Sequence, residues 1–236
     1  MKRGTFLAAS AVAAVLATDA CAKSPPATLD LVETAAEFDY AAFAKLVGRA
    51  TDVRQLWDID GYEPTALGAI KSAYNGYQFG YAIAPAQIGM IACLHGNANA
   101  FAYDDSMWAK YKLGTSFGFK DPSGNVVATN IFYHARSQAI TNADPNDMNS
   151  MYQDGTLEAL QRRGLTVLLC HTAAAEQARA LVAGGVAPAG MTAPDVLADL
   201  VAHTVPNAIV VPSMVATIGL LQNRFKYAYT TINPVS

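Results

Sequence analysis

The sequence predicts an α/β protein of one domain, a flavodoxin-like three-layer sandwich built on a mainly parallel five-stranded sheet. Short apolar runs alternate with segments of helical periodicity, which is typical of βα units. Apolar residues make up 52% and charged residues 15% of the chain, as expected for a compact globule. The length of 236 residues suffices for one large core and gives no reason to divide the chain into two domains.

Residues 1–22 have the features of a signal peptide. Lys2 and Arg3 precede an uncharged apolar stretch, and small residues around Cys21 permit cleavage after Ala22. The apolar run is too short for a membrane span, and we favour cleavage over a lipoprotein anchored at Cys21. The residues around Arg3 leave Sec and twin-arginine export open. We therefore expect a periplasmic or secreted mature protein without a membrane span.

Residues 23–50 are expected to form an N-terminal extension to a domain that covers residues 51–236. The pattern predicts the following elements in the first part of that domain: strands at 53–57 and 88–93, a helix after Pro64 and a short helix near 104–111. The polar stretch at 114–144 is long for a compact domain, so we expect a lid, an oligomer contact or a β-ribbon there.

The second half of the chain repeats the pattern with clearer helix signals. Helix signals begin at Asp144 and end at Gly164. The elements predicted after it are a strand at 165–170, a helix at 173–182, a helix capped by Thr192, a strand at 208–211, a helix at 213–223 and a strand at 227–231. Right-handed crossovers bring the carboxyl ends of such strands to one edge, where ligands bind.

Cys170 is the residue with the most distinctive chemistry at this edge. It ends a strand and precedes a helix, whose free N–H groups and dipole favour a thiolate and hence a nucleophile. The alternative is a small buried apolar side chain, which is common for a free cysteine. Position alone leaves both interpretations open.

Cys93, His95 and His171 are secondary candidates because they also lie at strand ends. Together with Cys170 they could bind a soft metal such as Zn or Cu(I), although their spacing matches no zinc motif. The usual order for this fold puts the first strand between the second and third, which separates Cys93 from Cys170 by about 10 Å. That distance is beyond disulfide reach. For His95, a hydrogen-bonded role is favoured over metal ligation.

A phosphatase receives weaker support from the sequence, and a nucleic-acid-binding or nucleotide-binding protein receives none. Asp58-Ile59-Asp60-Gly61 is similar to the nucleophile motif of haloacid dehalogenase-like phosphatases, but Tyr62 replaces the expected Thr. An acidic turn before the next helix is the favoured interpretation. The net charge of −3 offers no basic surface for nucleic acid, and no Gly-rich loop indicates a nucleotide. We expect no cofactor.

Four stretches resemble the DsrE/DsrF-like sulfur-relay family. Leu160 to Cys170 is similar to that family's helix, terminal glycine and strand ending in cysteine. The segments 209–213 and 227–229 are similar to its closing elements, and 91–98 resembles the strand ending in His-Gly of exported members. The resemblance implies that Cys170 carries sulfane sulfur as a persulfide. It also implies a homo-oligomer, a trimer or hexamer.

The favoured hypothesis is therefore an exported sulfur-transfer or sulfur-carrier protein. Its partners would be a donor or acceptor protein or a small sulfane-sulfur compound, and whether it is an enzyme of the sulfurtransferase kind stays open. The first alternative is a non-enzymatic oligomeric module that binds a metal or small ligand at the Cys/His edge. A phosphatase ranks last.

Overall fold

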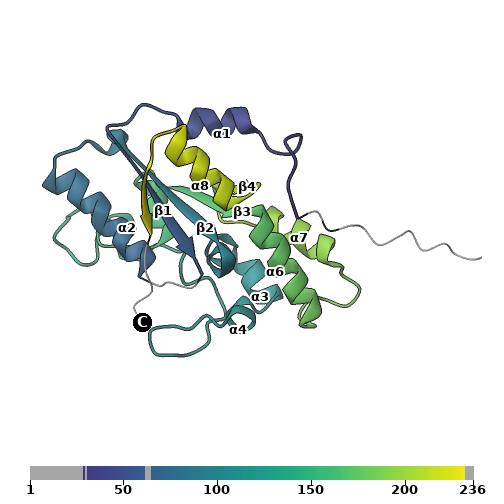
Figure 1. The fold of residues 1–236 in the computed structure, drawn as a ribbon. Helices are drawn as coiled ribbons and strands as arrows, with labels where there is room; N and C mark the ends of the chain where they lie inside the picture. Colours follow the sequence, from purple (N-terminus) through teal and green to yellow (C-terminus); the bar gives the residue numbers. More distant parts are fainter. Residues whose placement is uncertain (1–28, 30, 62–64, 232–236) are drawn as a thin grey trace, which may run out of the picture.

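A computed structural model describes residues 29, 31–61 and 65–231, and contains a sheet of five parallel strands (Figure 1). The strands are β1 (Val53–Asp60), β2 (Ile88–His95), β3 (Thr166–Cys170), β4 (Ala208–Val211) and β5 (Ala228–Thr231). The predicted α/β class with a parallel five-stranded sheet is confirmed. The predicted signal peptide lies outside the described residues. None of the helices in the described part of the chain is long and apolar enough to span a membrane.

The strand order is β4-β3-β2-β1-β5, which corrects the expected position of the first strand. β2, rather than β1, lies next to β3. The chain moves one place along the sheet at each of the first three crossovers, and the last crossover returns to the far side of β1. β2 is apolar along almost its whole length, which suits a strand covered on both faces, and in the central place seven of its eight residues are buried.

Helices cover both faces of the sheet. The helices are α1 (Tyr40–Val47), α2 (Ala66–Asn75), α3 (Asp105–Lys110), α4 (Leu113–Phe117), α5 (Leu157–Arg162), α6 (His171–Ala183), α7 (Ala193–Ala202) and α8 (Met214–Asn223). Shorter helical turns are η1 (Gly76–Gly80, π-helical), η2 (Pro85–Gln87), η3 (Gly96–Ala102) and η4 (Ser137–Ile140).

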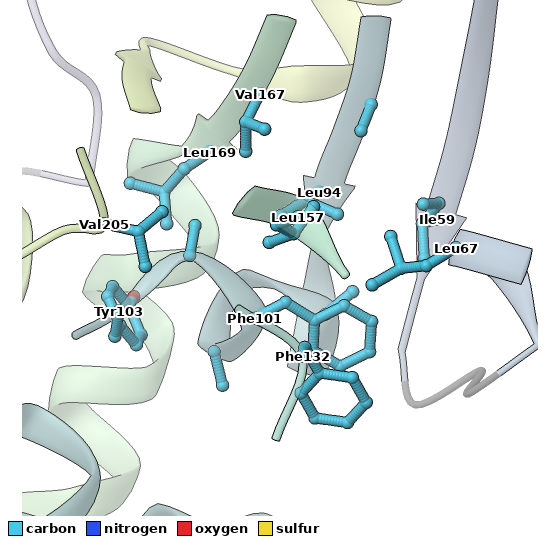
Figure 2. Packing of buried hydrophobic residues seen from close by; sticks show 14 of the residues in the cluster. Ile59, Leu67, Leu94, Phe101, Tyr103, Phe132, Leu157, Val167, Leu169 and Val205 are labelled. Carbon is cyan, nitrogen blue, oxygen red and sulfur yellow. The ribbon is translucent and has the colours of Figure 1, made fainter. Parts of the chain in front are cut away.

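The two faces of the sheet contribute to two separate apolar clusters. The larger cluster joins α2, α5, α6 and α7 to residues such as Ile59, Leu94 and Leu169, whose side chains point the same way in Figure 2. The smaller cluster joins α1 and α8 to the alternate strand residues, which include Cys93 and Cys170. α1 and α8 lie together on one side of the sheet (Figure 1). The N-terminal segment thus contributes α1 to the second helical layer.

The sequence located several elements well and misplaced the ends of others. β4 has its predicted bounds, and Thr192 caps α7 with the predicted capping box to Asp195. β1 and β2 extend further than predicted, so that Asp58 to Asp60 and His95 belong to strands. The expected acidic turn at Asp58 is therefore wrong. The two strands pair in register up to Asp60 and His95, which keeps this stretch extended.

The long polar stretch is anchored on the core. Phe132 stacks on Phe101 with ring centroids 3.9 Å apart, as Figure 2 shows. The Asn130 amide donates to the carbonyls of Phe101 and Tyr103. Within described residues 114–144 the β-ribbon expectation reduces to one antiparallel bridge, Lys120 to Val126.

The helix expected from Asp144 begins only at Leu157. The carboxylates of Asp144 and Asp147 accept hydrogen bonds from the backbone N–H groups two residues further on. Such local bonds compete with helix formation. Thr156 caps the helix instead, by accepting from the Ala159 N–H.

Candidate functional site

The Cys170 sulfur lies at the N-termini of two helices. Its Sγ accepts the Ala173 N–H of α6 at 3.5 Å and the Met214 N–H of α8 at 3.3 Å. β3 leads into α6 on one face of the sheet, whereas β4 leads into α8 on the other. The carboxyl ends of two such strands are where ligands bind in open parallel sheets. The sequence predicted both helices, but it placed only the N-terminus of the first one beside Cys170.

Asn99 holds the backbone of Cys170 in place. Its Nδ2 donates to the Cys170 carbonyl at 2.8 Å, and its Oδ1 accepts the Cys170 N–H at 3.0 Å. Asn99 is fully buried in η3, and Gln177 of α6 fixes that turn by donating to the Gly96 carbonyl. Both backbone groups of Cys170 are therefore satisfied by one side chain. Asn99 was not predicted as a site residue, although a polar residue between Ala98 and Ala100 was a usable signal.

His95 belongs to a network with Asp58 and Tyr229. His95 Nε2 lies 2.6 Å from Asp58 Oδ1, and its Nδ1 lies 3.6 Å from Asp60 Oδ1. The Tyr229 hydroxyl donates to Asp58 Oδ2, so both oxygens of Asp58 are engaged. Burial alone would lower the pKa of His95, but the hydrogen bond and charge of Asp58 outweigh it and raise the pKa.

The same network acts on Asp58 in the opposite direction. Burial alone would raise the pKa of Asp58, but the hydrogen bonds from His95 and Tyr229 outweigh it and lower the pKa. The carboxylate is thus held ionised by two donors. This is a less favourable environment for the nucleophile that a phosphatase needs, because each oxygen of Asp58 already accepts a hydrogen bond.

Cys93 lies on the same face of the sheet as Cys170 but does not pair with it. Cys93 is in register with Leu168, two residues before Cys170 on the neighbouring strand. One strand spacing and two residues along the strand give a Cα separation of about 8 Å, shorter than the predicted 10 Å but beyond disulfide reach. Both cysteines are free. Burial and the charge of Asp58 raise the pKa of Cys93, so it remains a thiol.

His171 begins α6 and lies near two carboxylates of the N-terminal segment, Glu33 and Glu37. In the described part of the chain, the buried Nδ1 of His171 has no hydrogen-bond partner.

A metal centre finds no support in the arrangement of these side chains. Cys93, His95, Cys170 and His171 all lie toward one edge of the sheet. Among the described residues, however, no three His, Cys, Asp or Glu side chains are grouped so that they could hold a metal ion.

Comparisons with known proteins found no relative of this chain. No protein-family model matches the chain, and neither a curated protein nor a solved structure matches it.

Proposed function

We propose that this protein is a sulfur-transfer or sulfur-carrier protein that holds sulfane sulfur as a persulfide on Cys170. The observation that carries the proposal is the pair of N–H groups, from Ala173 and Met214, that donate to Sγ. A thiolate is the nucleophile in such chemistry, and N–H donors at helix N-termini stabilise its negative charge. The resemblance of the segment ending at Cys170 to the DsrE/DsrF-like family supports the same assignment.

The transfer step needs no external oxidant. The Cys170 thiolate attacks the outer sulfur of a persulfide or polysulfide, and a new S–S bond forms. The S–S bond of the donor breaks, and its inner sulfur leaves as a thiolate with the electron pair of that bond. Attack by an acceptor thiolate on the outer sulfur of the Cys170 persulfide reverses the step and releases the Cys170 thiolate.

The burial of Cys170 favours a small donor. The residue is only 4% exposed, at an edge formed by two helix N-termini. A folded donor protein cannot bring a surface cysteine to such a site without first opening it. We therefore propose a low-molecular-weight sulfane-sulfur compound as the donor. Export and a homo-oligomeric state belong to the same proposal and follow from the N-terminal sequence and the family resemblance.

Intact-mass measurement after incubation with polysulfide tests the proposal. The reduced, folded wild type should gain sulfur, and cyanide should remove it again. Cys93→Ser should behave as the wild type does, whereas Cys170→Ser should gain nothing. An unchanged mass in the wild type, or equal gain in both variants, would refute the assignment to Cys170.

A further inference from the structure

Arg163 is a buried cation at the opposite end of β3 from Cys170. It follows the last residue of α5 and is only 7% exposed. The guanidinium carbon lies 4.8 Å from the Tyr74 ring centroid and 5.1 Å from that of Tyr152. Its Nη2 donates to Gln78 Oε1 over a long 3.4 Å. The sequence predicts Arg162 and Arg163 as cations in the last turn of a helix that stops at Gly164. Arg162 lies in that turn and pairs with Glu158, whereas Arg163 is buried.

Most of the hydrogen-bonding capacity of Arg163 is unused. Within the described part of the chain, Nε and Nη1 are buried without a partner, and no carboxylate forms an ion pair with the side chain. Other arginines reach a carbonyl or a carboxylate: Arg49, Arg54, Arg136 and Arg162. Burial lowers the pKa of Arg163 to about 10, so the group is still charged at neutral pH. A buried charge without a counter-ion is costly in free energy.

The surroundings of Arg163 supply further groups suited to a ligand. The Tyr74 hydroxyl is also buried without a partner among the described residues. Gln78 lies on η1, a π-helical turn of the kind often found at functional sites. Phe79 of the same turn packs edge-on against Tyr152 at 4.9 Å and is 45% exposed. A charged, donor-rich group thus lies beside a partly exposed aromatic surface.

We propose that Arg163 is the centre of a binding site for a small oxyanion, a carboxylate, phosphate or sulfate group. The N–H groups of a guanidinium lie in one plane and match the oxygens of such anions. The Tyr74 and Tyr152 rings lie within about 5 Å of the guanidinium carbon, and the unpartnered Nε and Nη1 are the donors that such an anion would use. This site is separate from Cys170 and does not depend on the sulfur chemistry proposed above.

Calorimetric titration with acetate, phosphate and sulfate at constant ionic strength tests this site. At least one anion should bind the wild type saturably. Arg163→Met should weaken that binding by about tenfold or more, because the paired N–H donors are lost. Arg163→Lys keeps the charge but not the planar donors and should also bind more weakly. Arg224→Met is the matched control, since Arg224 also faces a tyrosine ring but is exposed, and it should bind as the wild type does.

The outcomes separate the sources of the anion and the ways the inference can fail. Acetate binding alone would point to the carboxylate of an organic acid, and binding of phosphate or sulfate to a free inorganic anion. Circular dichroism establishes that each variant is folded, and removal of an unpaired buried charge should not unfold the protein. If no anion saturates the wild type, or if Arg163→Met binds equally well, the inference is wrong.

Discussion

From the hydrogen bonds between Asn99 and Cys170 we predict how much the free energy of unfolding falls when Asn99 is replaced. Asn99→Ala removes the side chain that satisfies both backbone groups of Cys170, at a position where both residues are buried. Each buried backbone group left without a partner costs about 1 to 3 kcal/mol. With two such groups, the substitution should therefore lower the free energy of unfolding by about 2 to 6 kcal/mol. That is a large part of the roughly 5 to 15 kcal/mol of a typical domain.

Urea unfolding of Asn99→Ala and Asn97→Ala measures this effect. Asn97 lies two residues earlier in the same helical turn and is exposed, so its substitution should cost little. Asn99→Asp separates the two hydrogen bonds, because a carboxylate can still accept the Cys170 N–H but cannot donate to the Cys170 carbonyl. It should destabilise the protein as well. Equal stabilities of Asn99→Ala and Asn97→Ala would refute the reasoning.

Persulfide formation provides a second measurement on the same variants. If Asn99 positions the sulfur between the two helix N-termini, Asn99→Ala should take up sulfur more slowly under conditions where it is fully folded. Asn97→Ala should keep the wild-type rate. A folded Asn99→Ala protein with the wild-type rate would limit Asn99 to a structural role.

Further predictions concern His95, Phe132 and Cys93. Against the effect of burial, Asp58 raises the pKa of His95, so the protonated ring stabilises the fold fully below the unfolded pKa of about 6.5. This contribution is lost as pH rises through the folded-state pKa of His95. The free energies of unfolding of wild type and His95→Gln should therefore converge at alkaline pH. A difference that stays constant with pH would contradict this prediction. Phe132→Ala should cost about 3 to 5 kcal/mol in urea unfolding, and the exposed control Ile131→Ala much less; equal losses would show that the loop is not anchored through Phe132. Cys93 should resist iodoacetamide in the folded protein, since burial raises the pKa of its thiol. Alkylation of Cys93 in the folded Cys170→Ser variant would contradict this.

The sequence predicted best where the signals are local. The bounds of β4, the capping box at Thr192 and the position of Cys170 at a strand end each depend on a few consecutive residues. The strand order depends on which strand is covered on both faces, and that is decided by the whole fold. The Asn99 contact joins residues 71 positions apart, and no local pattern indicates such a partner.

The burial of Arg163 also could not be predicted from the local sequence. A cation near a helix C-terminus before a glycine is typical of a solvated helix end, and Arg162 fits that description with its ion pair to Glu158. One residue further, the side chain turns inward between Tyr74 and Tyr152, which come from separate parts of the chain. The difference between the two arginines is set by neighbours that only the folded structure brings together.

The strand order also explains why Cys170 in particular acquires two N–H donors. The crossover after β3 continues along the sheet on one face, and the crossover after β4 returns across the other face to reach β5. Helices on opposite faces thus begin side by side only where these two strands end. A cysteine at the end of β1 or β2 would lie beside connections on a single face. The contact of Cys170 with the Met214 N–H therefore follows from the strand order. The contact with the Ala173 N–H follows from the local sequence, in which Cys170 directly precedes a helix.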